Sequence, residues 1–255
     1  MPSFASYPSL KGRGVFVSGG GSGIGASIVE HFAQQGAKVG FVDLDEAASR
    51  ALAEGIGEDG HPKPIFRPCD VRDTKAYQAV INEIAAAIGP ITTLVNNAAR
   101  DDRHAIDEVT EAYWDERMAV NLRHQYFAIQ SVVPGMRKTG GGSIVNLSSM
   151  SFVSMANRLS VYQAAKAAVI GMTRGLARDL GPDGIRVNSV MPGWIMTERQ
   201  IKLWLSPEGE ADLMERQCLK EKLYPPDIAR MILWLAADDS RLVTAQNFVV
   251  DGGRN

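Results

Sequence analysis

The chain has 255 residues, of which 45% are hydrophobic and 22% are charged, and its formal net charge is -2. A chain of this size and composition can bury a large core, commonly as one α/β domain. Because its charges nearly balance and no Lys/Arg run is dense, the composition argues against a nucleic-acid surface or a basic membrane patch and favours a small-molecule partner.

Strand-like apolar runs alternate with amphipathic stretches along the whole chain. The expected strands, in chain order, are residues 14–18, 38–43, 65–67, 93–95, 143–147, 185–190 and 247–250. The expected helices are residues 24–35, 46–54, 74–88, 111–138 and 162–180. This alternation predicts βαβ units, and the Val/Ile-rich strands are typical of strands buried on both faces. We therefore expect an α/β fold with a single Rossmann-type, doubly wound parallel sheet and helices on both faces.

The rhythm of strands and helices breaks between Pro192 and Pro225. This segment is helix-prone and contains Trp194 and Trp204, but it has no strand pattern. We expect one dinucleotide-binding and catalytic domain over residues 1–255, with a lid-like helical insertion at about 193–224.

Neither membrane insertion nor export is expected. Residues 1–10 lack an apolar core of signal-peptide length, and no run of about eighteen apolar residues occurs anywhere. The two cysteines, Cys69 and Cys218, form no CxxC pair and have no metal-ligand spacing. We therefore expect reduced thiols, no metal site and a cytoplasmic location.

The loop after the first expected strand is rich in glycine and reads SGGGSGIG over residues 18–25. Glycines let the backbone approach a pyrophosphate, whose charge then lies at the N-terminus of the following helix. A glycine-rich turn alone is an ordinary feature. Its position between a strand and a helix favours a dinucleotide site.

Asp43 ends the second expected strand, about twenty residues past the glycines, where a carboxylate can accept both ribose hydroxyls of NAD. Its charge repels a 2′-phosphate, and neither Ser22 nor Leu44 supplies the cation that NADP would need. An acidic residue at a strand end is common, but together with the glycine loop it predicts NAD as the cofactor.

Tyr162 and Lys166 are four residues apart, so they share one face of a helix. The pair is weak by itself, because it also arises by chance. Ser149 follows the carboxyl end of an expected parallel strand, where open α/β sheets bind ligands, and Asn121 lies in the preceding long helix. These four residues are the candidate catalytic group.

A catalytic role for Tyr162 requires a pKa below the value of about 10 of a free tyrosine. We expect the Lys166 ammonium and the positive nicotinamide ring to lower this pKa by roughly 2–3 units in a water-poor cleft. Tyr162 would then take the proton of the reacting hydroxyl, while the Ser149 hydroxyl holds its oxygen.

From about Leu10 to Gly253 these motifs resemble the short-chain dehydrogenase family. The family tetrad of Asn, Ser, Tyr and Lys falls on Asn121, Ser149, Tyr162 and Lys166. The cofactor-binding residues that the resemblance and the loop imply are Gly19, Ser22, Gly23, Ile24, Gly25, Asp43, Leu44, Asp70, Val71, Asn97, Ala98, Tyr162, Lys166, Pro192, Gly193, Ile195 and Thr197.

The sequence departs from the family pattern at two positions. Ser18 stands where Thr is usual, which keeps the hydroxyl. Ala99 replaces the glycine that normally closes the Asn-Asn-Ala-Gly motif. If that position needs a positive φ, the loop before Arg100 must differ locally.

Three further stretches resemble the bacterial aldose 1-dehydrogenases of this family, of the D-xylose, L-arabinose or D-galactose type. They are residues 101–104, residues 113–117 with 121–124, and residues 206–211 with 217–220. Each stretch also has a purely structural explanation: their arginines would pair with nearby acids, Trp114 would be a core residue, and His104 would be structural rather than catalytic.

The closer resemblance implies transfer of a hydride from C1 of a pentose or hexose to NAD+, which gives an aldonolactone. The substrate contacts would come from Ser149, Ser151, Asn157, Trp194 and Arg100. The family also implies a homotetramer. The alternatives are a dehydrogenase of another secondary alcohol or hydroxy acid, and a catalytically silent NAD-binding regulator.

Overall fold

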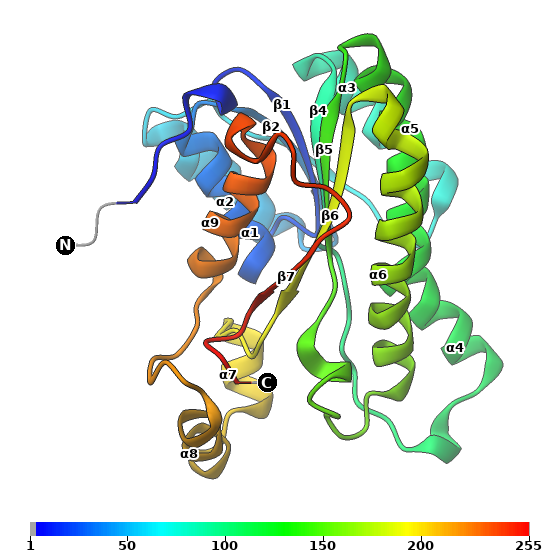
Figure 1. Cartoon of the computed structure of the whole chain (residues 1–255), viewed down its shortest axis with the longest axis vertical. Helices are drawn as coiled ribbons and strands as arrows, with labels where there is room; N and C mark the ends of the chain where they lie inside the picture. The colour runs from blue at the N-terminus through cyan, green and yellow to red at the C-terminus, as the bar shows by residue number, and fades with distance from the viewer. Residues whose placement is uncertain (1–3, 255) are drawn as a thin grey trace.

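A seven-stranded parallel sheet forms the centre of the computed structural model, which describes residues 4–254 (Figure 1). The strand order is β3-β2-β1-β4-β5-β6-β7, and every neighbouring pair is parallel. The strands are β1 (Gly14–Ser18), β2 (Lys38–Asp43), β3 (Ile65–Pro68), β4 (Ile91–Asn96), β5 (Gly142–Leu147), β6 (Ile185–Pro192) and β7 (Asn247–Val250). The predicted fold class is confirmed.

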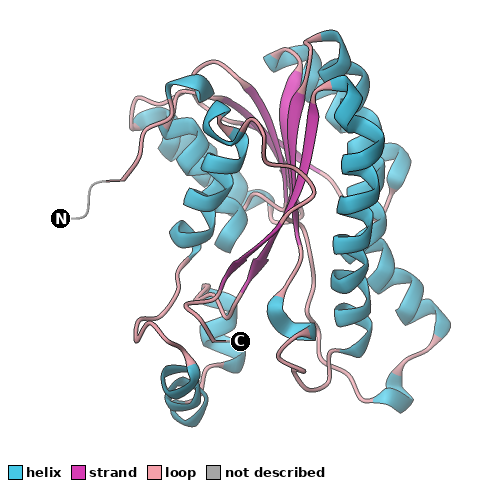
Figure 2. Cartoon of the chain, viewed as in Figure 1, coloured by secondary structure: helices cyan, strands magenta, loops and turns pink. Residues whose placement is uncertain are grey.

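Helices cover both faces of this sheet (Figure 2). The α-helices of residues 4–254 are α1 (Gly23–Gln34), α2 (Glu46–Glu58), α3 (Thr74–Ile88), α4 (Glu111–Met118), α5 (His124–Lys138), α6 (Ser160–Leu180), α7 (Glu198–Trp204), α8 (Pro207–Arg216) and α9 (Pro225–Ala236). One core lies between the sheet and α1, α2 and α9, and the other lies between the sheet and α3, α5 and α6. None of the helices in this range is both long and apolar enough to cross a membrane.

The strand β1 explains why the buried runs show no alternation of polar and apolar residues. All five of its residues are buried. Val15 and Val17 face the core under α1 and α9, whereas Phe16 faces the core under α3 and α5. Successive side chains of a strand point to opposite faces, so a strand with a core on each side must be apolar at every position.

The order of the strands by itself predicts where in the molecule a ligand binds. The chain runs outward from β1 to β3 and then crosses back to β4, so the direction of winding reverses between β1 and β4. The connecting loops diverge at the carboxyl ends of these two strands. In open α/β sheets that crevice is where ligands bind.

The long helix expected over residues 111–138 is present with these bounds, but it is not α-helical throughout. A π-helical segment, η3 (Ala119–Arg123), separates α4 from α5. It inserts a wider turn at Asn121, so α4 and α5 do not present one common face. Single π turns of this kind frequently occur at functional sites.

The sequence-based expectations include no helix after Pro225, but the structure has α9 there. Proline is favoured in the first turn of a helix, where its missing N–H is not needed. The apolar face of α9 is fully buried at Ile228, Ile232 and Leu235. It packs against α1 and completes one side of the molecule.

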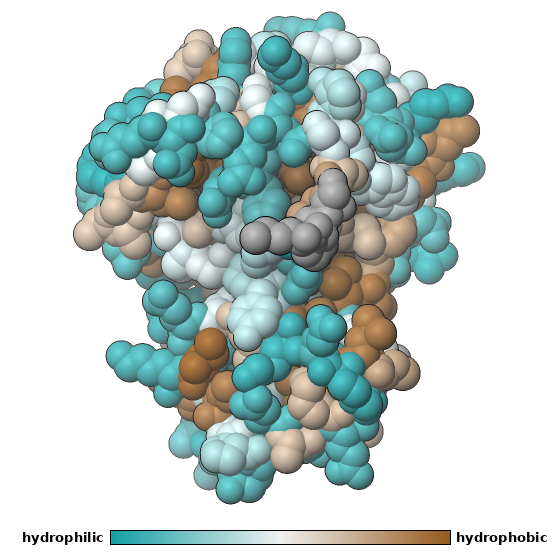
Figure 3. Space-filling view, turned by 90° about the vertical axis from the view of Figure 1, so that its left-hand side faces the viewer, coloured by the Kyte–Doolittle hydropathy of each residue, from teal (hydrophilic) through white to brown (hydrophobic). Residues whose placement is uncertain are grey.

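Residues 193–224 contain the two short helices α7 and α8, as the expected helical insertion requires. Thr197 begins α7 by accepting a hydrogen bond from the backbone N–H of Gln200, and Ser206 caps α8 in the same way. Both helices lie beyond the carboxyl ends of the strands, at the lower end of the molecule in Figure 1. The surface there mixes charged and apolar side chains (Figure 3), and Ile201 and Leu203 are among the exposed apolar ones.

Candidate active site

A cavity of about 1000 Å³ opens at the carboxyl ends of the parallel strands. The loops after β1, β2, β3, β4, β5 and β6 contribute to its wall, and α7 lies across it. Each of the cofactor-binding residues expected from the sequence lines this cavity. The structure therefore brings together residues that the sequence spreads from Gly19 to Thr197.

The glycine loop and the first turn of α1 form a cradle that suits a pyrophosphate. A side chain at Gly25 would place its Cβ 1.8 Å from the Gly19 carbonyl oxygen, and Gly23 has a φ of 53°. Ser22 precedes α1 but makes no side-chain cap hydrogen bond, so the first N–H groups of the helix lack the usual cap. Free N–H groups at a helix N-terminus bind phosphate, and the loop therefore fits a dinucleotide.

The hydroxyl of Ser18 ties β1 to the loop that follows β4. Its Oγ accepts hydrogen bonds from the backbone N–H groups of Asn97 (3.0 Å) and Ala98 (3.1 Å). The Asn97 side chain donates in return to the carbonyls of Ser18 and Gly19. The hydroxyl that accepts these hydrogen bonds is present in both serine and threonine. The replacement of the usual threonine by Ser18 therefore has no structural consequence here.

Asp43 lies at the adenosine end of the cavity and is held by backbone groups alone. Its carboxylate accepts hydrogen bonds from the N–H groups of Gly21 (2.8 Å), Leu44 (2.7 Å) and Asp45 (3.1 Å). No salt bridge to Asp43 occurs within residues 4–254. A carboxylate that is fixed in this way keeps lone pairs for further donors such as ribose hydroxyls.

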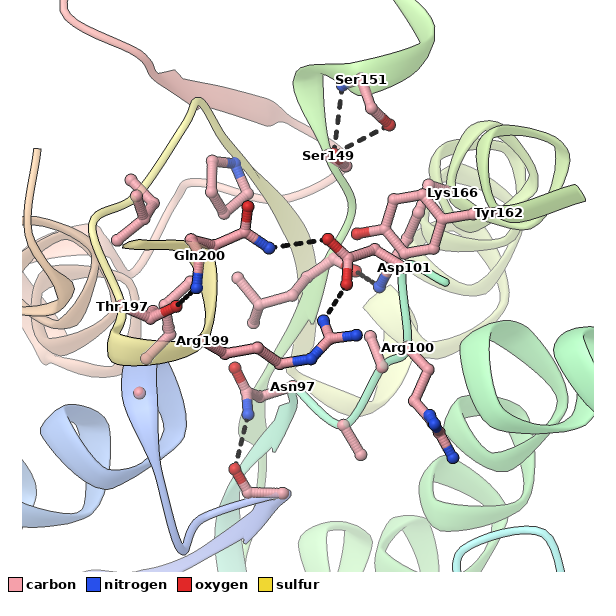
Figure 4. A pocket seen from close by; sticks show the side chains of 18 of the residues that line it. Asn97, Arg100, Asp101, Ser149, Ser151, Tyr162, Lys166, Thr197, Arg199 and Gln200 are labelled. Atoms are coloured by element: carbon pink, nitrogen blue, oxygen red, sulfur yellow. Dashed lines mark hydrogen bonds and ion pairs between the residues drawn. The ribbon is translucent and has the colours of Figure 1, made fainter. Parts of the chain in front are cut away.

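Tyr162 and Lys166 project from α6 toward the loop after β4 (Figure 4). The Lys166 ammonium lies 5.6 Å from the centroid of the Tyr162 ring, and its Nζ donates to the carbonyl of Leu147 at 2.8 Å. Ser149 follows β5, and its hydroxyl donates to Ser151 Oγ at 3.0 Å. Three of the four tetrad residues therefore line one end of the cavity.

The electrostatics of this group differ from the sequence-based expectation. Burial, together with the charge of Asp101, raises the pKa of Tyr162 above its ordinary value, while the Ser149 hydroxyl and Arg199 act in the opposite direction. Burial lowers the pKa of Lys166 to about 7, although Asp101 opposes that shift. The groups of the chain alone do not lower the pKa of Tyr162, because desolvation disfavours its phenolate more than nearby positive charge favours it.

Asn121 is fully buried and does not line the cavity. From the π-helical segment its Oδ1 accepts from the backbone N–H of Arg100 (2.9 Å), and its Nδ2 donates to the carbonyls of Arg100 (3.1 Å) and Arg117 (3.0 Å). The side chain thus holds both backbone groups of one residue in the loop after β4. Its place in the structure is that of a positioning residue for this loop.

The second departure from the family pattern is also resolved. Within residues 4–254, Ala99 is not among the non-glycine residues with positive φ, which are Met155, Arg158 and Ala245. The position therefore needs no glycine, and alanine fits without backbone strain. Arg100, which follows it, lines the cavity as expected, as do Ser151, Asn157 and Trp194.

His104 is structural, as the sequence suggested. It is buried, its Nε2 lies 3.4 Å from the backbone nitrogen of Val161, and its Nδ1 lies 3.2 Å from the Ala105 carbonyl. A tautomer with the proton on Nδ1 satisfies both contacts and caps the first turn of α6. Trp114, in contrast, is 44% exposed, so its interpretation as a core residue is wrong.

Two residues of α7 that reach the loop after β4, Arg199 and Gln200, are not predicted from the sequence. Arg199 forms ion pairs with both Asp101 and Asp102, and Gln200 Nε2 donates to Asp101 at 2.7 Å (Figure 4). Almost 100 positions separate the partners in the chain. No spacing motif could link them, because only the tertiary fold brings α7 over this loop.

Comparison with known proteins agrees with this geometry. A family model described as enoyl-(acyl carrier protein) reductase matches residues 19–255. The chain belongs to the short-chain dehydrogenase/reductase family, and it is therefore an oxidoreductase that uses a nicotinamide cofactor.

Two curated relatives are similar over nearly the full length. The chain is 49% identical to a probable galactose dehydrogenase, GalD, of Rhizobium meliloti (strain 1021), over 99% of this chain and 98% of that protein. It is 48% identical to a D-xylose 1-dehydrogenase of Caulobacter vibrioides, over 98% of this chain and 99% of the relative. Among solved structures, a 7α-hydroxysteroid dehydrogenase in complex with NADH superposes with a TM-score of 0.92 at 29% identity, over 97% of this chain and 96% of the other.

Proposed function

We propose that the protein oxidises C1 of a cyclic pentose or hexose with NAD+ and releases an aldonolactone. The relatives named as galactose and D-xylose dehydrogenases support an aldose substrate. The observation that carries the proposal is the chemistry of the cavity wall, where Ser149, Ser151 and Asn157 line the same cavity as Tyr162, and where Arg100 and Arg199 are each paired with an acid of the loop after β4. Such a wall suits a neutral polyol better than an anion.

The reacting groups come from two elements of the chain. Tyr162 takes the proton of the C1 hydroxyl, and the Ser149 hydroxyl holds the same oxygen as its charge changes. Lys166, whose Nζ donates to the Leu147 carbonyl and lies 5.6 Å from the centroid of the Tyr162 ring, favours the phenolate when it is protonated. A bound NAD+ supplies the hydride acceptor.

The oxidation of an aldose in its ring form requires few catalytic groups from the protein. Its C1 already carries two oxygens, so loss of a hydride and a proton leaves an ester carbonyl that the ring oxygen stabilises. The protein needs only a base at the C1 hydroxyl and a cavity that orients the ring. Trp194, which lines the cavity and is fixed by a hydrogen bond to Gln200 (3.0 Å), offers an apolar face for the sugar.

The experiment is to incubate the enzyme with NAD+ and D-xylose, L-arabinose, D-galactose or L-fucose, to follow NADH at 340 nm, and to trap lactone with hydroxylamine. We expect at least one aldose to be oxidised faster than simple secondary alcohols and 2-hydroxy acids, with lactone trapped in proportion to NADH. Faster oxidation of the simple alcohols, or no trapped lactone, would contradict the proposal.

Asp43 also leads us to propose NAD+ as the preferred cofactor. A fixed carboxylate without a cation repels the 2′-phosphate of NADP+, so kcat/KM with NAD+ should be at least about tenfold higher, or roughly 1.4 kcal/mol. Asp43→Ala should narrow this ratio, whereas Asp59→Ala, a change of an exposed acid after α2, should leave it unchanged. Equal efficiency of the wild type with both cofactors would contradict the assignment.

A further inference from the structure

The carboxylate of Asp101 lies where the loop after β4, the helix α7 and the catalytic tyrosine meet (Figure 4). Its side chain is 23% exposed and lines the cavity. Figure 4 shows Asp101 next to Tyr162 and Lys166, and its charge raises the pKa of both groups. The catalytic roles proposed above do not use this residue.

The partners of Asp101 leave part of its hydrogen-bonding capacity unused. One carboxylate oxygen pairs with Arg199, and the other accepts from Gln200 at 2.7 Å. An ionised carboxylate has about four lone-pair positions, so two acceptor positions remain. A sugar presents hydroxyl donors on adjacent carbons, which match two acceptor oxygens on one planar group.

A negative charge at this place is a disadvantage for the chemistry. It disfavours the phenolate of Tyr162, which proton transfer requires. An amide of the same shape would fill the same space without that effect. We therefore look for a role of this carboxylate outside proton transfer. An ionised carboxylate only accepts hydrogen bonds, so it is well suited to bind the hydroxyl groups of a neutral ligand.

Two side chains of α7 fix the carboxylate. Arg199 spans Asp101 and Asp102, and Gln200 is itself held by the N–H of Trp194. Arg103 adds a second link between the loop and α7, because its guanidinium lies 4.1 Å from the centroid of the Trp204 ring. A carboxylate whose two oxygens are each bound to a side chain of one helix offers its remaining lone pairs in a defined orientation.

We propose that Asp101 is a specificity-determining residue that accepts hydrogen bonds from sugar hydroxyls remote from C1, with Arg199 and Gln200 as its positioning residues. This inference rests on the proposed function. It assigns part of the sugar recognition to a contact between the loop after β4 and α7, so residues of the lid-like insertion act through Asp101.

The test measures sugar binding separately from turnover. Calorimetry of the enzyme–NADH complex with its best aldose substrate gives the Kd of the sugar. We expect Asp101→Asn to raise this Kd and the KM by tenfold or more, while the Kd of NADH changes less than twofold. Asp107→Asn makes the same chemical change at an exposed site in η2 (Ile106–Glu108), six residues further along the chain, and should behave as the wild type.

Deoxy analogues of the substrate identify the contact itself. The analogue that lacks the hydroxyl bound by Asp101 should bind the wild type weakly, and Asp101→Asn should weaken it no further. If Asp101→Asn fails to fold, Asp101→Glu keeps the charge but moves the carboxylate, and the same loss of sugar affinity is expected.

The role of Arg199 needs a readout that a merely structural residue would not change. In Arg199→Gln the charge of Asp101 acts on Tyr162 without its partner. Because Arg199 lowers the pKa of Tyr162 and Asp101 raises it, the acidic limb of kcat/KM should move to higher pH. The double variant Asp101→Asn/Arg199→Gln should return the limb toward its wild-type position, with Lys166 and Ser149 left as the groups that face Tyr162.

The outcomes separate this inference from the proposed function. If the wild type oxidises an aldose to a lactone but Asp101→Asn and Asp101→Glu bind it within twofold of the wild type, the inference is wrong and the proposed function stands. A change in the Kd of NADH in place of the sugar Kd also overturns it. If the wild type oxidises no aldose, both fail together.

Discussion

At the scale of single residues, the chemistry depends on how a few side chains balance burial against charge. Tyr162 and Lys166 both resist ionisation in the cavity, and the charge of Asp101 opposes the phenolate while favouring the ammonium. The raised pKa keeps the Tyr162 hydroxyl neutral in the chain without cofactor. We therefore expect Tyr162 to act as a base only when cofactor and substrate are bound.

We expect Tyr162→Phe to lower kcat by about 10²–10⁴-fold, because the phenol handles the proton while the ring merely fills space. The Kd of NADH, measured by fluorescence, should stay within a few-fold of the wild type. Tyr126→Phe, which removes a hydroxyl from a half-exposed residue of α5, is the matched control. A Tyr162→Phe enzyme that keeps a tenth of its activity would rule out the proton-transfer role.

Lys166 should make the stability of the cofactor-free protein depend on pH. Its pKa is lowered to about 7 in the folded chain, against about 10.4 when unfolded, so the unfolded state binds more protons between these values. The free energy of unfolding therefore increases as pH rises from about 7 to 10, because the cost of burying the charged Lys166 disappears when the folded protein loses this proton. The gain is lost again as pH falls through the same window.

The comparison that isolates this effect is the free energy of unfolding of Lys166→Met minus that of the wild type, from urea titrations at pH 6.5, 8 and 9.5. The difference should favour the variant most at pH 6.5 and shrink toward pH 9.5. The raised pKa of Cys69, about 11, affects both proteins alike and cancels. Parallel pH curves would show that Lys166 titrates normally in the folded protein.

At the scale of elements, the π-helical turn between α4 and α5 connects the long helix to the cavity. It lets the buried side chain of Asn121 reach Arg100, whose neighbours carry the charged contacts with α7. A straight α-helix would have one residue fewer in this turn, and the side chains beyond it would be rotated relative to the loop.

Asn121→Ala should lower the free energy of unfolding by about 1–3 kcal/mol, because it leaves the N–H of Arg100 and two carbonyls without their partner. The loop after β4 should lose its position, so we also expect kcat/KM to fall at least tenfold. Lys138→Ala, an exposed change at the end of α5, should alter neither quantity. Urea denaturation measures the free energy of unfolding, and steady-state rates give kcat/KM. If Asn121→Ala has the stability and the kcat/KM of the wild type, Asn121 is not a positioning residue.

At the scale of the whole molecule, we expect the protein to assemble as a homotetramer, as its family resemblance implies. The physical support is apolar surface on the helices that flank the sheet: Trp114 of α4 is 44% exposed and Tyr126 of α5 is 48% exposed. Large exposed aromatic side chains are enriched where subunits meet.

Light scattering should give a mass about four times the 27.6 kDa of one chain at micromolar concentration. Trp114→Asp or Tyr126→Asp should shift the mass toward smaller species if these residues lie in an interface, whereas Leu219→Asp, an exposed change outside both helices, should not. A monomeric wild type would refute the assembly.

The sequence by itself determined the features that depend on local pattern. Buried strands need unbroken apolar runs, so the strands beginning at Gly14 and Lys38 have the predicted bounds. The strand beginning at Asn247 also has its predicted bounds, although it lies at the edge of the sheet and is only partly buried. The glycine loop, the acid at Asp43 and the Tyr162–Lys166 pair also follow from spacing within one loop, strand or helix, and their residues line the cavity as expected. Short-range geometry is fixed by the backbone, which is why the positions of these residues can be predicted from local spacing.

Only the tertiary structure decided what depends on distant segments. The contact of Asp101 with Arg199, the buried apolar face of α9 and the position of Asn121 outside the cavity wall have no signature in local spacing. The raised pKa of Tyr162 belongs to the same class, because desolvation is set by every element that packs around the group rather than by its neighbours in the chain. Side chains nearly 100 residues apart meet because the parallel strands deliver their loops to one edge of the sheet, and that is a property of the fold as a whole.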